Sequence, residues 1–375
     1  MSDVRRRTAT PAPKRRTAHG RLFGILAGIC TIAAAAGVTA VVLGGEGGPR
    51  IVASALASAD TGEYVIAIAG GEREDAVLAF AADDPATIRE VARFSHLPGY
   101  TSRGATSPAG RRAALIVADG GTQSRPIASL ILLDLDTGAL TRFAERVDTL
   151  QTPLFDPSGS RVIFTRTAAS DSPATNVQVS EIDIATGWES PIASVPGVLG
   201  AYPVGFDASG ALLIVVIDGR GSSLLRAGET LLQLSDAITR DWRVSPDGQR
   251  IAFVETLTTN GVSYHARVID LASAPQGRVA AQQVASGQQL GIAWRPGSAD
   301  PTAGQDPSST ALHAAGAEAG FDVPLGYSGS GDYLVAETWS GASFDAPGQV
   351  EMQLLHGGAR HDLHGATRFL GWVKR

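Results

Sequence analysis

The apolar and polar positions of the sequence repeat one pattern, in which a short turn of polar and glycine residues precedes an apolar run. Six copies align on a glycine: ADTGEYVIAIA (Gly62), SPAGRRAALIVA (Gly110), DPSGSRVIFTR (Gly159), DASGALLIVVI (Gly210), SPDGQRIAFVE (Gly248) and SGSGDYLVAET (Gly331). Successive glycines lie 48, 49, 51, 38 and 83 residues apart, and a weaker copy, AWRPGSAD at Gly297, divides the last interval into 49 and 34. A recurring period of this size indicates a repeat architecture.

The chemistry of each position predicts a strand, a tight turn and a second strand. Asp or Ser at the first position can accept hydrogen bonds from the turn backbone. Proline presets the backbone angle that the next position needs, and glycine adopts the conformation closed to residues with a Cβ. The prolines are Pro108, Pro157, Pro246 and Pro296. Apolar residues end the preceding strand, at Phe155, Phe206, Val244, Trp294 and Tyr327.

A second hairpin follows each turn. Its copies are LILLDLDTGALTRF, VSEIDIATGWESPI, ARVIDLASAPQGRV and MQLLHGGARHDL. Four antiparallel strands with a period of roughly 40 to 50 residues are typical of a β-propeller blade. We therefore predict an all-β, six-bladed propeller, or a seven-bladed one if the Gly297 copy forms a blade. The terminal GATRFLGWV is expected to pair beside the first blade, and residues 298–320 to be a flexible insertion without a strand.

These repeats resemble the WD40-like repeats of TolB-type β-propellers, whose motif is an aromatic residue, Ser-Pro-Asp-Gly and a short apolar strand. Ser245-Pro246-Asp247-Gly248, followed by Ile251-Ala252-Phe253, matches that motif fully. The copies at Gly62, Gly210 and Gly331 lack the proline. The resemblance covers residues 51–375 and implies the fold, with envelope assemblies as a common setting. It does not define a function, because the motif residues build the blade.

The N-terminal region predicts a membrane anchor. Residues 22–43 contain no charge, and at about 1.5 Å per residue they span roughly 33 Å, enough for a hydrocarbon core of about 30 Å. Seven basic residues precede them within residues 1–21. Positive charge stays in the cytoplasm, so we predict a cytoplasmic tail (1–21), a transmembrane helix (22–43), a linker (44–50) and a propeller outside the cytoplasmic membrane (51–375). A cleaved signal peptide is the alternative, since Ala33–Ala36 offers small residues.

Charge and cysteine content narrow the possible partners. Residues 22–375 hold 24 basic and 36 acidic residues, a formal charge of −12. Such an acidic body would repel a phosphate backbone, so no nucleic-acid partner is expected. Cys30 is the single cysteine, so no disulfide can form within the chain. A lipid on Cys30 is disfavoured because the preceding Ile29 is bulky.

No convincing catalytic or metal-binding constellation is found in the sequence. His356, His361 and His364, with Asp362, could supply zinc ligands, but they fall on the hairpin turn of the last repeat. Asp134 recurs as Asp183 and Asp270, which indicates a turn-capping residue. The Gly-x-Ser-x-Gly motif of hydrolases is absent from the sequence. We therefore predict no catalytic residue, no metal and no cofactor.

Binding is instead expected in the loops that do not repeat. In propellers, the connections between blades and the loops between the second and third strands gather on one face around the channel. Exposed Tyr, Trp and Arg side chains dominate many protein contacts. The candidate binding residues are Tyr100, Arg103, Tyr202, Arg240 and Trp242. An alternative for Trp242 in particular is packing between blades.

These observations predict a membrane-tethered propeller that binds an envelope protein or glycan. The alternative is a propeller hydrolase or lyase acting on cell-wall carbohydrate, with acids or a metal converging at the channel mouth, such as Asp241 with the histidines. An apolar or sparsely charged channel would argue against that enzyme.

Overall fold

The computed structural model describes residues 50–53, 56, 61–167, 175–259, 261–272, 277–278, 281–309 and 320–375. All of these residues belong to one compact unit. The predicted transmembrane helix at residues 22–43 lies outside the described residues. Within the described ranges, no helix is long and apolar enough to cross a membrane.

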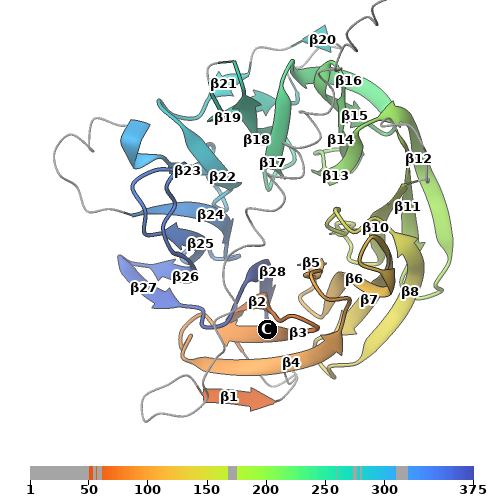
Figure 1. The fold of residues 1–375 in the computed structure, drawn as a ribbon, viewed down its shortest axis with the longest axis vertical. Helices are drawn as coiled ribbons and strands as arrows, with labels where there is room; N and C mark the ends of the chain where they lie inside the picture. The colour runs from red at the N-terminus through yellow and green to blue at the C-terminus, as the bar shows by residue number, and fades with distance from the viewer. Residues whose placement is uncertain are drawn as a thin grey trace, which may run out of the picture. The chain divides into compact units, whose positions relative to one another are not determined.

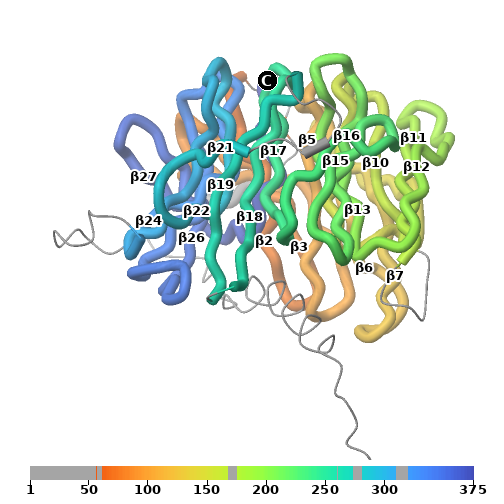
Figure 2. The backbone as a smooth tube through the Cα atoms, turned by 90° about the horizontal axis from the view of Figure 1, so that it is seen from above, coloured from red at the N-terminus to blue at the C-terminus, as the bar shows by residue number. Residues whose placement is uncertain are grey.

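Six four-stranded antiparallel blades form a ring, which confirms the predicted all-β propeller (Figure 1). We call the axis that the inner strands surround the channel. The first strand of each blade lies innermost and the fourth outermost. Figure 2 shows the ring edge-on, with the strands of neighbouring blades side by side. The blades are numbered here in chain order.

Blades 1 to 3 occupy the first half of the described chain. Blade 1 comprises β28 (Arg368–Lys374), β2 (Glu63–Gly70), β3 (Glu74–Ala81) and β4 (Thr87–Ser95), with β1 (Arg50–Ala53) parallel to β4. Blade 2 comprises β5 (Arg103–Thr106), β6 (Arg112–Thr122), β7 (Arg125–Asp134) and β8 (Leu140–Val147). Blade 3 comprises β9 (Leu154–Phe155), β10 (Arg161–Thr167), β11 (Thr175–Asp183) and β12 (Glu189–Val198).

Blades 4 to 6 follow in the same order. Blade 4 comprises β13 (Gly200–Phe206), β14 (Leu212–Asp218), β15 (Gly221–Arg226) and β16 (Glu229–Ser235), with β20 (Gly277–Arg278) at its edge. Blade 5 comprises β17 (Ile238–Val244), β18 (Arg250–Leu257), β19 (Ser263–Asp270) and β21 (Gln282–Gln283). Blade 6 comprises β24 (Phe321–Tyr327), β25 (Leu334–Trp339), β26 (Val350–His356) and β27 (Ala359–Asp362).

The weak repeat at Gly297 forms a hairpin between blades 5 and 6. Its strands are β22 (Gln289–Ala293) and β23 (Thr302–Gln305), and a 3-10 helix, η1 (Pro307–Ser309), follows. Figure 1 shows β22 between β17 and β24. The structure differs here from the strandless insertion expected at 298–320, because β23 lies within it. The sequence indicated a turn at Gly297 but carried no apolar run after it.

The C-terminal strand closes the ring, as predicted. β28 pairs antiparallel with β2, with Val373 opposite Tyr64 and Gly371 opposite Ile66. The backbone of Arg375 donates a hydrogen bond to the Gly62 carbonyl oxygen over 2.9 Å. Blade 1 is therefore built from both ends of the described chain, and no edge of β2 is left unpaired.

The repeated turns have the predicted chemistry. The Ser245 hydroxyl accepts a hydrogen bond from the Arg250 amide over 2.9 Å, and the Asp156 carboxylate accepts one from the Arg161 amide over 2.7 Å. Gly248 has a φ of 68°, in the region that favours glycine. Its missing Cβ also matters, because that atom would lie 2.4 Å from the Ala208 amide nitrogen of blade 4.

The apolar runs form the core, which lies in the layers between adjacent blades. The second strands of blades 3 and 5 place Phe164 and Phe253 there, and β3 of blade 1 contributes Phe80. Each of these side chains is fully buried. Burying one such side chain contributes about 1.5–3 kcal/mol. The layers between blades thus hold the ring together without disulfides.

Gly104 tests the packing of the closing strand. An added Cβ would lie 2.5 Å from the Ala114 carbonyl oxygen and 3.1 Å from Leu370 Cδ2 of β28. We expect Gly104→Ala to lower the free energy of unfolding by about 1–3 kcal/mol, as overpacking does. The matched control is Gly219→Ala, since nothing lies within 4 Å of its added Cβ. Equal urea midpoints for the two variants would contradict close packing between β5 and β28.

Candidate functional site at the channel mouth

The inner strands all begin at the same end of the channel. In blades 2 to 6, each enters from the loop that connects it to the preceding blade and ends in the repeated glycine turn, whereas β28 ends beside the Gly62 turn of blade 1. We call the end where they begin the loop face. Charged and polar side chains meet there, and we call this group the mouth cluster. Its members are Arg103 (β5), Arg240 and Asp241 (β17), Tyr264 (β19), Glu337 (β25) and Arg368 (β28).

Asp241 lies at a β-bulge of the inner strand β17. The register of β17 against β18 shifts between Arg240 and Arg243, and Asp241 has a φ of 53°. Its Oδ1 lies 3.2 Å from Arg240 Nε, and its Oδ2 accepts a hydrogen bond from the Gly291 amide over 3.1 Å. Gly291 occupies the bulge of the neighbouring strand β22. One carboxylate thus links two bulges and holds a guanidinium at the channel.

Glu337 and Tyr264 are titratable groups in a poorly solvated environment. Burial raises the pKa of Glu337, and the charge of Asp241 acts in the same direction. A hydrogen bond from Trp339 Nε1, 3.2 Å long, and the positive charges of Arg368 and Arg240 oppose that rise. Burial also raises the pKa of Tyr264, against the effect of Arg240. Shifted pKa values of this kind are common at functional sites.

Arg368 forms no ion pair with any residue that the structure describes. Burial and, next, the positive charge of Arg103 lower the pKa of Arg368 to about 10, although Glu337 and Asp75 favour its charge. Its Nε is buried without a hydrogen-bond partner among the described residues. The side chain nevertheless stays protonated at neutral pH. The mouth cluster therefore contains a guanidinium with unused donors.

Asp75 and His96 form a buried pair beside the start of β5. His96 Nε2 lies 3.2 Å from Asp75 Oδ1, and both side chains are at most 1% exposed. His96 Nδ1 lies 2.8 Å from the Leu97 carbonyl oxygen, and Asp75 Oδ2 accepts a hydrogen bond from the Ser102 amide over 2.9 Å. Asp75 thereby positions the residue just before Arg103.

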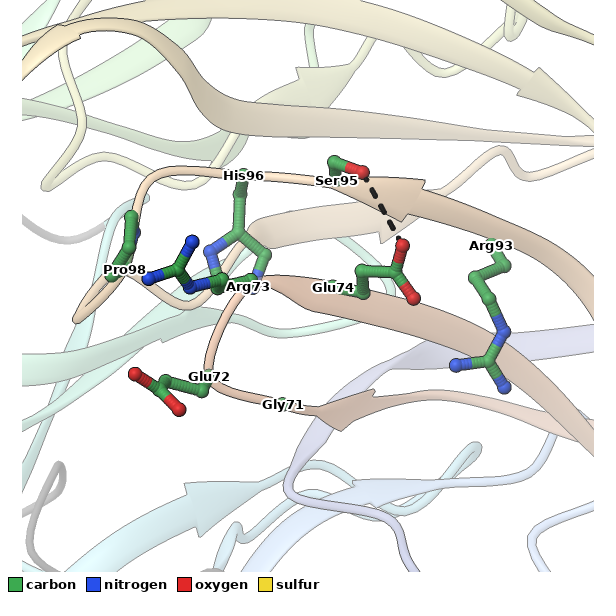
Figure 3. Close-up of a pocket in the computed structure, with 8 residues that line it drawn as sticks. All are labelled: Gly71, Glu72, Arg73, Glu74, Arg93, Ser95, His96 and Pro98. Atoms are coloured by element: carbon green, nitrogen blue, oxygen red, sulfur yellow. Dashed lines mark hydrogen bonds between the residues drawn. The ribbon is translucent and has the colours of Figure 1, made fainter.

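His96 also borders an open pocket of about 720 Å³ on the loop face of blade 1. Figure 3 shows its lining residues: Gly71, Glu72, Arg73, Glu74, Arg93, Ser95, His96 and Pro98. Glu74 accepts a hydrogen bond from Ser95, and Arg93 is paired with Glu90 over 2.6 Å. This pocket is wide open, and two of its basic residues, Arg93 and His96, are paired with carboxylates, so the mouth cluster is the better candidate site.

Two of the predicted binding residues, Arg103 and Arg240, belong to the mouth cluster. Tyr100 lies in the loop before β5, where its hydroxyl donates a hydrogen bond to the Gln123 carbonyl oxygen over 2.6 Å. Tyr202 and Trp242 pack against each other with ring centroids 4.8 Å apart, against the core between blades 4 and 5. These two aromatic side chains thus have a packing role, the alternative stated for Trp242.

Sequence reasoning missed Glu337, Arg368 and Tyr264. A signal existed for Glu337, because it interrupts an apolar run that continues as Ile251-Ala252-Phe253-Val254 in the fifth blade. Arg368 begins the closing strand as Arg103 begins β5, but only ring closure brings the two together. The proposed combination of Asp241 with the histidines is not formed. Asp241 lies on the innermost strand of blade 5, whereas His361 lies on β27, the outermost strand of blade 6.

The fold is shared with solved propeller structures. They include TolB from Acinetobacter baumannii (15% identity, TM-score 0.46, covering 78% of this chain and 63% of that chain) and a putative TolB from Agrobacterium tumefaciens (14%, 0.46, 78% and 89%). A prolyl endopeptidase also matches (11%, 0.51, 80% and 50%). The chain thus spans less than two thirds of the first structure and half of the third. No family model and no curated protein sequence matches it.

The topology of the strands establishes the class of fold, the β-propeller. The function depends on the residues of the site. At 11% identity, the prolyl endopeptidase match supports the fold alone. Membership of the TolB family remains a prediction from the repeat motif.

Asp241 offers a test of the bulge. Alanine and glycine both remove the carboxylate, but a Cβ at a left-handed φ costs about 1–2 kcal/mol. We therefore expect Asp241→Gly to retain about 1 kcal/mol more stability than Asp241→Ala in urea unfolding. Asp241→Asn serves as the control that keeps an acceptor for Gly291 and removes the charge. If alanine is tolerated as well as glycine, the strained backbone is not needed.

Proposed function

We propose that this protein is a membrane-tethered extracytoplasmic propeller that binds an envelope protein or glycan on its loop face. The observation that carries the proposal is the mouth cluster, in which three guanidiniums and two carboxylates from four blades converge on the channel. Burying charged groups is costly unless they are paired. The charged groups of the mouth cluster converge on the loop face, and this supports a binding role for that face.

The arrangement of the acidic groups favours binding over catalysis. Asp241 is held by Arg240 and the Gly291 amide, and Asp75 by His96 and the Ser102 amide. Glu337 accepts a hydrogen bond from Trp339. Each carboxylate therefore has a positioning partner, and the described residues contain no group of three or more His, Cys, Asp or Glu that could hold a metal.

An enzyme acting on cell-wall carbohydrate is the second candidate. It is favoured by Glu337, because burial raises the pKa of this carboxyl and a raised pKa suits a general acid. Such an enzyme would shorten purified cell-wall fragments, and Glu337→Gln would abolish that activity. A binding platform would leave the fragments intact.

Crosslinking in intact cells tests the binding face. A photoreactive amino acid replacing Thr101, exposed on the loop face, is expected to capture a partner, because it lies two residues from Arg103. The matched control is the same replacement at Gln249, exposed at the glycine turn at the opposite end of β17. Adducts are identified by mass spectrometry. Equal capture from both positions, or none from Thr101, would rule out a loop-face platform.

The proposed membrane anchor, residues 22–43, is tested separately from the binding face. We expect the mature protein to remain in the membrane fraction through high-salt washing and to dissolve only in detergent, since the apolar segment spans the bilayer. Mass spectrometry of that fraction should recover the peptide Thr17–Arg21. A new terminus between Ala36 and Gly45 would instead show a cleaved signal peptide.

A further inference from the structure

The start of β5 and the start of β28 place two arginines side by side at the channel mouth. The Thr106 hydroxyl of β5 donates a hydrogen bond to the Trp372 carbonyl oxygen of β28 over 3.2 Å, which aligns the two strands. Arg103 lies three residues before Thr106, and Arg368 lies four before Trp372. Because β28 has an extra residue at its register shift between Phe369 and Gly371, the two arginines lie at similar heights. An added Cβ on Gly104 would touch Leu370, so the two strands are also in close contact there.

These two guanidiniums have N–H donors that are not used in hydrogen bonds to described residues. Neither forms a hydrogen bond or an ion pair with another residue in the described part of the chain, and Arg368 Nε is buried without a partner. Both residues are half-buried, so neither is completely shielded from solvent. Two like charges held together in this way destabilise the unliganded protein. An anion between them would supply both the counter-charge and the missing acceptors.

The neighbouring charges limit the kind of anion. Arg240 is already paired with Asp241, and Glu337 and Asp75 lie within the electrostatic reach of Arg368. These carboxylates would repel a multiply charged ligand. The propeller and its linker together also carry a strong negative charge, which opposes a polyanion such as a chain of uronic acids. A single carboxylate fits best, because its two oxygens match the forked donors of arginine.

We propose that Arg103 and Arg368 form a carboxylate-binding subsite at the channel mouth, which takes one acidic side chain or terminal carboxylate of a bound polypeptide. This inference rests on the proposed binding function and specifies the chemistry of the ligand. The lowered pKa of Arg368 agrees with it, because burial and the charge of Arg103 already disfavour a second positive charge at this point. The carboxylate would relieve that repulsion.

The first experiment measures the thermal midpoint of the full chain in detergent. Sodium acetate is titrated against sodium chloride and inorganic phosphate at equal ionic strength, so that screening is constant. Acetate is expected to raise the midpoint of the wild type progressively, as a ligand specific for the folded state does. In Arg368→Gln and Arg103→Gln the apparent affinity for acetate should fall at least about tenfold, since charge-assisted hydrogen bonds are lost.

The controls separate binding from folding. Arg220→Gln removes an arginine whose side chain is 89% exposed and should leave the acetate response unchanged. Arg103→Glu supplies Arg368 with an internal carboxylate, so it should raise the midpoint without ligand and abolish the response to acetate. A lower midpoint for both Arg103→Glu and Arg368→Gln without ligand would show that the two arginines are structural, which overturns the proposal. So would an equal acetate response in the wild type and Arg368→Gln, or a preference for phosphate.

A second arm identifies the source of the carboxylate. A peptide with blocked ends, whose single charged group is one glutamate, should bind more tightly than acetate, whereas an oligomer of uronic acids should not. Stronger binding of the oligomer would overturn the polypeptide assignment. Crosslinking from Thr101 is then repeated in Arg103→Glu cells. Loss of the adduct supports the subsite. If the adduct persists in Arg103→Glu cells, the subsite is refuted but the proposed binding function is not. If no adduct forms in wild-type cells, the proposed binding function itself is refuted.

Discussion

The pairing of β28 with β2 is the interaction on which the rest of the structure depends. It joins strands that are separated by nearly the whole described chain. Blade 1 thereby takes its innermost strand from the C-terminal end of the chain, whereas its other three strands come from the first repeat. Closing such a long loop costs conformational entropy, which the layers of apolar side chains on both sides of blade 1 offset. Without this closure, β2 would present an open edge and the inner strands would not surround a channel.

Ring closure also crowds the inner strands, and the backbone adapts to that crowding. The inner strands β13, β22, β24 and β28 carry register shifts next to glycines at Gly205, Gly291, Gly326 and Gly371. An added Cβ at Gly205 would lie 2.7 Å from Val244 of the next blade. Bulges of this kind turn side chains out of the regular alternation. In β17 an aspartate takes such a position, so the bulge also carries a charge.

The channel mouth follows from the same constraint. Arg368 can approach Arg103 only because the last strand of the chain becomes the innermost strand of blade 1, next to β5 of blade 2. Asp241 reaches the Gly291 amide only because the β22–β23 hairpin occupies a place in the ring between blades 5 and 6. The charges meet where the ring is closed and little water surrounds them, which explains their shifted pKa values. A rigid scaffold thus holds a charged site that no single repeat contains.

The repeat itself could be predicted from the sequence because its determinants are local. Asp or Ser, proline and glycine define a tight turn through short-range hydrogen bonds and backbone angles, and alternation with apolar runs defines the strands. Arg103 and Arg240 could be proposed for the same reason, as residues of loops and strand starts. Tyr202 and Trp242 could not be assigned in this way, since a half-buried aromatic ring packs equally well against a partner or a neighbouring blade.

The sequence by itself therefore determined the fold class, the turns and the closing strand. The tertiary structure alone decided which charged residues meet. Glu337 and Arg368 lie on strands, outside the predicted loops, and become neighbours only through the curvature of the ring. The Gly297 copy is a similar case, because its strand β23 has few apolar residues and is held by pairing with β22 and contact with β24. Local chemistry encodes strands and turns, whereas a site formed between blades depends on contacts distant in sequence.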